Sequence, residues 1–281
     1  MTVLTDSAKV TALADQFILD LHAELQARWE AWPLDLEKQE VHEVVGALLA
    51  RQVTLARELA QAPSTWNYHI GPIVLRAMAD AYISLAWVLA DPVERSRRFI
   101  HYGLGQEKLR LEHRKEELKG RSPRPEEQRM FDATERWIDA QRYSFLTEVD
   151  VGSWSGVSTR QMAEECGCLD FYNYVYQPFS ACAHSMWHHI GKYNVKRCEN
   201  PLHRYHLVPD DPEYLADLDL LYLAGKYVEK AFRLFDQQTG VVVRVLSAFT
   251  RLGTAMDELS CSDADARPAP AGETNGSSPR T

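Results

Sequence analysis

Two long stretches of this chain lack the charged residues that its other helical segments carry at nearly every turn. Residues 71–90 hold Arg76 and Asp80 as their only Asp, Glu, Lys or Arg, and residues 171–191 hold none. A helix that is apolar on nearly all sides is buried on most of them. The sequence therefore predicts two central helices that pack against each other, with the rest of the chain folded around them.

Helical periodicity and helix-ending residues divide most of the remaining chain into further helices. Runs of alternating apolar and polar residues are few, so we predict an all-α fold, a single multi-helix bundle of about eight or nine helices over residues 1–259. Residues 260–281 are rich in Ser, Asp, Ala, Pro and Gly and are predicted to be a disordered tail. The predicted helices cover residues 7–32, 37–61, 71–90, 93–119, 126–148, 158–165, 169–190, 211–236 and 241–259.

Composition excludes several classes of protein. With 45% hydrophobic and 25% charged residues, the chain is neither disordered nor fibrous, and a net charge of −9 excludes a generally basic nucleic-acid coat. An odd number of cysteines, five, does not form a disulfide framework. The amino terminus lacks the apolar core of a signal peptide, so we expect a cytoplasmic protein. Residues 71–90 are long enough to cross a membrane, but Arg76 and Asp80 oppose this, and we expect no membrane association.

The polar side chains in the two charge-poor segments need partners once they are buried. Arg76 and Asp80 are four residues apart, so they share a helical face and can pair. Tyr176, Ser180 and His184 follow one another at the same spacing in the second segment. Two interpretations stay open. Either these groups satisfy one another as a structural network, or they line a polar pocket in which His184 exchanges protons near neutral pH.

Two stretches of sequence resemble a bacterial family that is known only as a domain of unknown function, DUF5677. They are GPIVLRAMADAYISLAWVLADPVER, residues 71–95, and WSGVSTRQMAEECGCLDFYNYVYQPFSACAHSMWHH, residues 154–189. In the first, the family shows an Arg followed four residues later by an acidic residue, usually Glu. In the second, it shows a Trp-containing turn and then a tyrosine-rich helix with Ser-x-x-x-His. The positions that match are Arg76, Asp80, Tyr176, Ser180 and His184.

The resemblance extends over about residues 40–240 and implies an all-helical fold without a settled activity. Asp80 departs from the usual Glu, and its shorter reach would loosen a contact in a pocket. Some helical bacterial families of this general appearance are HEPN-like, and these often serve as RNase toxins or defence effectors. That link is an analogy between folds.

The first functional hypothesis is metal-independent RNA cleavage. HEPN-type nucleases have an Arg and a His with four to six residues between them, so that the His exchanges a proton and the Arg stabilises the phosphorane charge. Arg95 and His101 have this spacing, although Arg is frequent in that segment and a chance match is the simpler explanation. The alternative pair is Arg76 with His184, brought together from separate helices.

If Arg76 and His184 form the catalytic pair, the neighbouring residues have supporting roles. Arg76 would bind the phosphate, Asp80 would orient Arg76, and His184 would transfer the proton. Ser180 and Tyr176 would hold either His184 or the substrate.

A locally basic segment fits the RNA hypothesis. Residues 95–124 contain ten Lys or Arg and four Glu, a net of +6 within an acidic protein. Such a helix is able to follow phosphates, but Glu–Lys and Glu–Arg pairs on a solvated helix explain it equally well. The candidate RNA-binding residues are Arg95, Arg97, Arg98, Lys108, Arg110 and Arg114.

The second hypothesis is a metal enzyme. His184 and His188 have the helical spacing that places two imidazoles on one metal, and Asp80 is a candidate third ligand. The motifs HExxH and paired ExxH are absent, so we expect no metal or other cofactor; if a metal binds, the expected ligands are His184 and His188. Other potential ligands follow in the next residues: His189, Cys198, His203 and His206.

The third hypothesis is a non-enzymatic helical protein that binds a small ligand or forms a homodimer through an aromatic face. The aromatic residues that could form this face are Trp66, Tyr68, Trp87, Trp137, Trp154 and Trp187. Large aromatic residues are more often part of the core, and both possibilities stay open.

Of the three hypotheses, the sequence favours an RNA-targeting effector of stress or phage defence over a binding protein or a His-ligated metal enzyme.

Overall fold

The charge-poor helix α3 (Gly71–Ala90) lies at the centre of the fold. The computed structural model describes residues 7–141 and 153–265. Within them α3 contacts α2 (Gln39–Ala60), α10 (Leu218–Thr239) and α8 (Gln177–Ala183), so it is surrounded on several sides. Leu75, for example, is completely buried, which stabilises the fold by roughly 1.5–3 kcal/mol.

Among the described residues, α3 is the one helix that is long and apolar enough to cross a membrane, with a mean hydropathy of 1.6 over its best window. In the fold, 61% of that window is buried against other helices. The apolar surface of α3 is therefore used in the core, as the sequence predicted.

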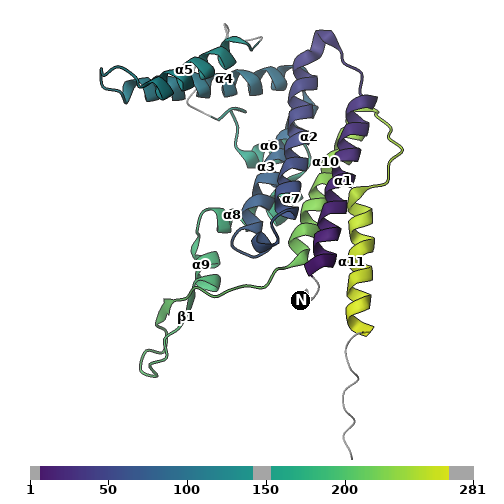
Figure 1. Ribbon diagram of the computed structural model, residues 1–281, viewed down its shortest axis with the longest axis vertical. Helices are drawn as coiled ribbons and strands as arrows, with labels where there is room; N and C mark the ends of the chain where they lie inside the picture. Colours follow the sequence, from purple (N-terminus) through teal and green to yellow (C-terminus); the bar gives the residue numbers. More distant parts are fainter. Residues whose placement is uncertain (1–6, 142–152, 266–281) are drawn as a thin grey trace, which may run out of the picture.

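Five long helices stand side by side as an upright bundle (Figure 1). Besides α2, α3 and α10, they are α1 (Ser7–Ala31) and α11 (Ala248–Asp265), which pack against each other and against α2 and α10 respectively. Short 3₁₀ turns, Leu36–Lys38 and Pro63–Thr65, lie on either side of α2. The largest fully buried side chains of the bundle include Phe17, Trp66, Phe232 and Phe235.

A pair of helices extends sideways from the top of the bundle as an arm (Figure 1). Helix α4 (Pro92–Glu116) leaves the bundle after the turn at Asp91, and α5 (Pro125–Asp139) folds back along it. The arm has a small core of its own, made by Leu111, Phe131 and Ile138.

The second charge-poor segment forms one helical run over residues 169–183 and then a separate short helix, instead of one continuous helix. It runs through α7 (Leu169–Phe171), a π-helical turn (Tyr172–Tyr176), α8 and α9 (Trp187–Tyr193). Between α8 and α9, Ser185 has a φ of 50°, a left-handed conformation that ends α8. The prediction that residues 169–190 are mostly helical is therefore confirmed, except at this turn.

A β-hairpin follows α9, in a region for which the sequence suggested only irregular structure. Strands β1 (Val195–Arg197) and β2 (Leu207–Pro209) pair antiparallel, with Arg197 opposite Leu207. In Figure 1 the hairpin lies at the lower left, away from the bundle.

The all-α prediction is confirmed, and most helix bounds lie within a few residues of those predicted. Helix α6 (Thr159–Glu165) has Ser158 as its N-cap, and the Ser158 side chain accepts a hydrogen bond from Gln161 N–H. Two starts were placed too early: α10 begins at Leu218, capped by Asp217, and α11 begins at Ala248.

The predicted tail at 260–281 is only partly described. Helix α11 continues to Asp265, beyond the predicted end of the domain at 259, whereas 266–281 lie outside the described residues. The helix predicted over 126–148 ends earlier than expected, because α5 stops at Asp139 with Ala140 as its C-cap, and residues 142–148 lie outside the described residues.

Candidate functional site

Arg76 joins the two charge-poor segments. Its guanidinium forms an ion pair with Asp80, one turn further along α3, and its Nε donates a hydrogen bond of 2.7 Å to Ser180 Oγ on α8. The carbon of the guanidinium lies 3.3 Å from the centre of the Tyr176 ring, in a cation–π contact. Four of the five residues predicted to form one site, Arg76, Asp80, Tyr176 and Ser180, therefore converge. We call these four residues the Arg76 cluster.

Local backbone geometry positions Tyr176 and Ser180. Pro178 lies in the first turn of α8, and just before it the Gln177 N–H bonds to Tyr172 C=O, five residues back, which widens the helix into a π turn. The Ser180 hydroxyl in turn donates a 2.7 Å bond to Tyr176 C=O. That bond fixes the Ser180 oxygen that accepts from Arg76.

The Arg76 cluster lies at the edge of the core. The Arg76 side chain is 12% exposed, whereas Asp80 is about half exposed. Burial raises the pKa of the Asp80 carboxyl above its usual value, and both the Arg76 guanidinium and the Tyr176 hydroxyl counteract this by favouring the carboxylate. The cluster therefore combines a nearly buried cation with a carboxylate that solvent still reaches.

His184, the fifth predicted residue, does not join the cluster in this structure. It is the C-cap of α8, where its N–H donates a hydrogen bond to Ser180 C=O, and its side chain is exposed. Among the described residues, no hydrogen bond links its imidazole to Arg76 or Asp80. The prediction that this part of the chain is buried on most sides is wrong, because the chain turns outward at Ser185.

The Arg95–His101 pair does not form a site on α4. Six residues along an unbroken helix correspond to about 9 Å of rise and about 240° of rotation, so the two side chains point in different directions. Arg95 is engaged elsewhere: it donates to Trp87 C=O at 2.7 Å and pairs with Glu165 at 3.2 Å.

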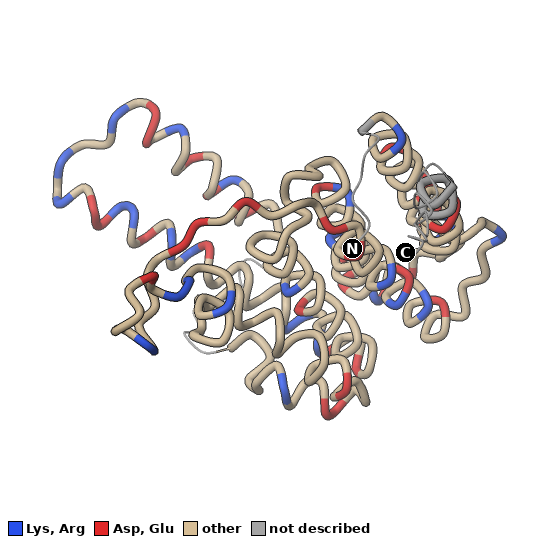
Figure 2. The backbone as a smooth tube through the Cα atoms, turned by 90° about the horizontal axis from the view of Figure 1, so that it is seen from below, with Lys and Arg blue, Asp and Glu red and all other residues tan. Residues whose placement is uncertain are grey.

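The other candidate RNA-binding residues lie along the arm, where charges of both signs alternate (Figure 2). Arg97 pairs with the buried Glu40 at 2.7 Å, and Arg110 pairs with Glu107 at 2.9 Å. Helix α5 carries five carboxylates and two arginines. It therefore offsets half of the net charge of +6 that residues 95–124 carry. Of the remaining candidates, Arg98 donates to Ser155 C=O, Arg114 contacts Met130 Sδ, and Lys108 lies half-buried between α4 and α5.

The metal hypothesis loses the geometry on which it was based. His184 is the C-cap of α8 and His188 lies in α9, so the two are not neighbours on one helix. Three other candidate ligands do come together: Cys198, His203 and His206, in the loop of the hairpin.

The large aromatic residues divide between the core and the surface. Trp66 and Trp87 are buried, and Trp154 packs edge-on against Trp87. The other three side chains, those of Tyr68, Trp137 and Trp187, are exposed to solvent.

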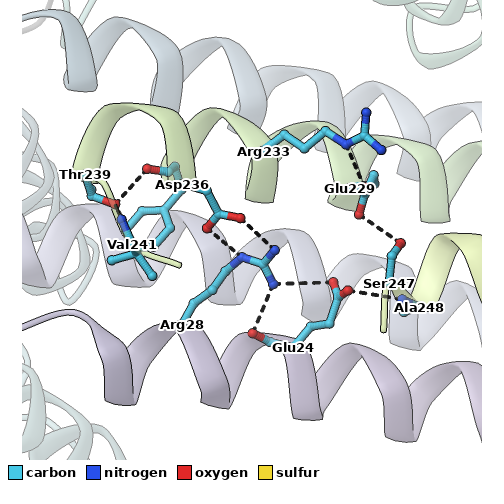
Figure 3. A network of polar contacts seen from close by, with 10 residues as sticks. Glu24, Arg28, Glu229, Arg233, Asp236, Thr239, Val241, Ser247 and Ala248 are labelled. Atoms are coloured by element: carbon cyan, nitrogen blue, oxygen red, sulfur yellow. Dashed lines mark hydrogen bonds and ion pairs between the residues drawn. The ribbon is translucent and has the colours of Figure 1, made fainter. Parts of the chain in front are cut away.

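A buried charge network in the bundle was missed by the sequence analysis. The Arg28 guanidinium donates two bonds of 2.9 Å to the carboxylate of Asp236 on α10 (Figure 3). The same guanidinium lies 3.5 Å from Glu24, whose other oxygen accepts from Ala248 N–H at the start of α11. Glu24 and Arg28 continue the buried face of Phe17 and Leu21 at helical spacing. Charged residues at these core positions were the signal in the sequence that could have indicated a buried ion pair.

The pKa of Glu24 predicts how stability depends on pH. Burial raises this pKa from 4.5 to about 7, although Arg28 lowers it in part. Between these values the folded state keeps a proton that the unfolded state releases, so the contribution of Glu24 to stability is lost as pH rises through about 7. We expect the stability of the wild type relative to Glu24→Gln to fall by roughly 3 kcal/mol from acidic to mildly alkaline pH.

Urea unfolding of both proteins at about pH 5 and about pH 8 measures this change. Glu258→Gln, the same substitution at an exposed position of α11, serves as the control and should follow the wild type. If the free energy of unfolding changed by the same amount between the two pH values in the wild type and in Glu24→Gln, the expectation would be contradicted.

Comparison with known proteins places the Arg76 cluster in a recognised family region. A family described as "Family of unknown function (DUF5677)" matches residues 42–201, more than half of the chain. No curated protein and no solved structure matches this chain. The matched region contains all four residues of the cluster as well as His184.

Proposed function

The chain belongs to the DUF5677 family of unknown function, and from its site we propose that it is a HEPN-like, RNA-targeting effector that cleaves RNA without a metal. Under this proposal it acts in the bacterial cytoplasm, in stress or phage defence. The Arg76 cluster binds a phosphate of the RNA, and His184 transfers the proton.

The fixed guanidinium of Arg76 is the observation that carries the proposal. Two of its nitrogens are held by Asp80 and Ser180, and its face rests on Tyr176. Among the described residues, no group accepts a hydrogen bond from the remaining nitrogen, Nη2. A guanidinium held in this way offers directional donors to a phosphate with little further loss of side-chain entropy.

His184 supplies the proton chemistry. Its side chain is exposed one helical turn after Ser180, on the same short helix that contacts Arg76. Imidazole serves as acid or base near neutral pH. In this role it would remove the proton from the 2′-hydroxyl or protonate the leaving 5′-oxygen, while Arg76 stabilises the charge on the phosphorane.

The test is the integrity of RNA after incubation with purified protein, with and without a chelator. We expect the wild type to cleave in both conditions and His184→Ala to be inactive with unchanged melting, because the side chain is exposed. His188→Ala removes another exposed histidine four residues later and should remain active. Equal cleavage by wild type and His184→Ala, or no cleavage by the folded wild type, would contradict the proposal.

A second candidate function is a non-enzymatic interaction domain. It is favoured by large apolar side chains that remain exposed at the start of α3 and around α8 and α9. If folded wild-type protein leaves RNA intact, this becomes the better proposal. These residues are Ile70, Ile73, Tyr174, Met186 and Trp187.

A further inference from the structure

The loop of the hairpin gathers three side chains that bind transition metals. Residues 198–206 connect β1 to β2, and Cys198, His203 and His206 each direct one ligand atom to the same place. These three atoms all lie within 4.8 Å of one another. None of the three residues belongs to the Arg76 cluster.

The spacing of the donors agrees with tetrahedral coordination. Cys198 Sγ lies 3.6 Å from His203 Nδ1. A zinc ion with bonds of about 2.3 Å to sulfur and about 2.0–2.1 Å to nitrogen, at the tetrahedral angle, requires a separation of about 3.6 Å. The thiol and the imidazole therefore already stand at the distance that a shared zinc ion sets.

The backbone of the loop holds the ligands in place. Cys198 N–H donates to His206 C=O at 3.0 Å, so the first and last ligands face each other where β1 and β2 end. His206 N–H donates to His203 C=O at 3.0 Å, in the turn between the two histidines. Asn200 Oδ1 accepts a hydrogen bond from Leu202 N–H inside the loop. The backbone of the loop is thus positioned before any ion binds.

The hairpin has little else to stabilise its tip. Each strand has three residues, and Leu202 and Tyr205 in the loop are 87% and 82% exposed. A two-stranded hairpin without a packed face is marginal in water. A metal that joined both sides of the loop would stabilise the hairpin.

We propose that Cys198, His203 and His206 form a zinc site that closes the hairpin loop. A thiolate and two imidazoles are the ligand types that zinc prefers, and the three leave a fourth position for water. Cys198 must lose its proton when it binds the ion, so binding releases a proton and weakens in acid. The site is independent of the proposed RNA chemistry.

The test is a titration of the full-length, metal-free protein with Co²⁺, which reports coordination by its spectrum. We expect one equivalent to bind with the near-ultraviolet band of a sulfur–cobalt bond and the intense visible bands of a tetrahedral ion. Zinc should displace the cobalt and abolish these bands. Cys198→Ser should lose the sulfur band, and His206→Asn should weaken binding at least tenfold.

His188→Asn is the matched control, because it removes an exposed histidine outside the loop. It should bind Co²⁺ as the wild type does. The exposed hairpin lies outside the bundle, so circular dichroism should show the same helical content in every variant. A wild type without the sulfur band, a band that persists in Cys198→Ser, or one that disappears in His188→Asn would each overturn the proposal.

Discussion

Asp236→Ala is expected to lower the free energy of unfolding by about 3 kcal/mol, as the removal of one partner of a buried ion pair typically does. The substitution leaves the Arg28 guanidinium, whose side chain is 7% exposed, without its two 2.9 Å bonds. Glu24 compensates only in part, because burial keeps its pKa at about 7. We place the effect at the lower end of the usual range because Asp236 itself is 26% exposed. Urea unfolding at neutral pH measures it.

The control for this prediction is Asp257→Ala, the same change at an exposed position of α11. Its unfolding curve should lie close to that of the wild type. If Asp236→Ala were as stable as Asp257→Ala, the Arg28–Asp236 pair would not stabilise the contact between α1 and α10.

Arg76→Lys is expected to reduce the rate of RNA cleavage by about 10²-fold, the usual effect of removing one donor that stabilises the transition state. Lysine keeps the positive charge and can still pair with Asp80. It lacks the planar fork that reaches Ser180 and a phosphate at the same time. The melting temperature should stay within about 4 °C of the wild type, because the half-exposed Asp80 remains solvated. Single-turnover cleavage and thermal melting measure the two effects.

The Arg76 cluster was largely predictable because its cause is visible in the sequence. A helix with a single Arg and a single Asp must bury most of its surface, and the only other segment without charges was the natural partner. Packing these two segments brings Arg76 to Ser180, which is 104 residues away in the chain. Their polar residues then become partners for one another, as the bond from Arg76 to Ser180 shows.

The position of His184 was not predictable from the same pattern. A regular helix over 169–190 would have kept Ser180, His184 and His188 near one face. Instead α8 ends at Ala183 and is followed by a left-handed residue, Ser185, which is not a glycine and gave no signal in the sequence. The outward turn exposes His184 and places His188 on the next helix.

The Arg28 network and the hairpin depend on contacts that sequence spacing does not reveal. Arg28 and Asp236 are separated by 208 residues, and nothing in either segment identifies the other as its partner. Cys198, His203 and His206 were noted as potential ligands, but only the pairing of β1 with β2 brings the cysteine beside the histidines. Short strands of three residues are too brief to show a clear alternating pattern.

The most direct test of the proposed function compares Arg76→Lys with wild type and with Arg233→Lys, in RNA cleavage and in thermal melting. Arg233 is exposed on α10 and pairs with Glu229, so it controls for the same chemical change away from the cluster. We predict that only Arg76→Lys cleaves RNA more slowly, by about 10²-fold, and that all three proteins melt within a few degrees of one another. If Arg76→Lys cleaves RNA as fast as the wild type, or melts far below it, the Arg76 cluster is a structural joint between α3 and α8 and not a phosphate site.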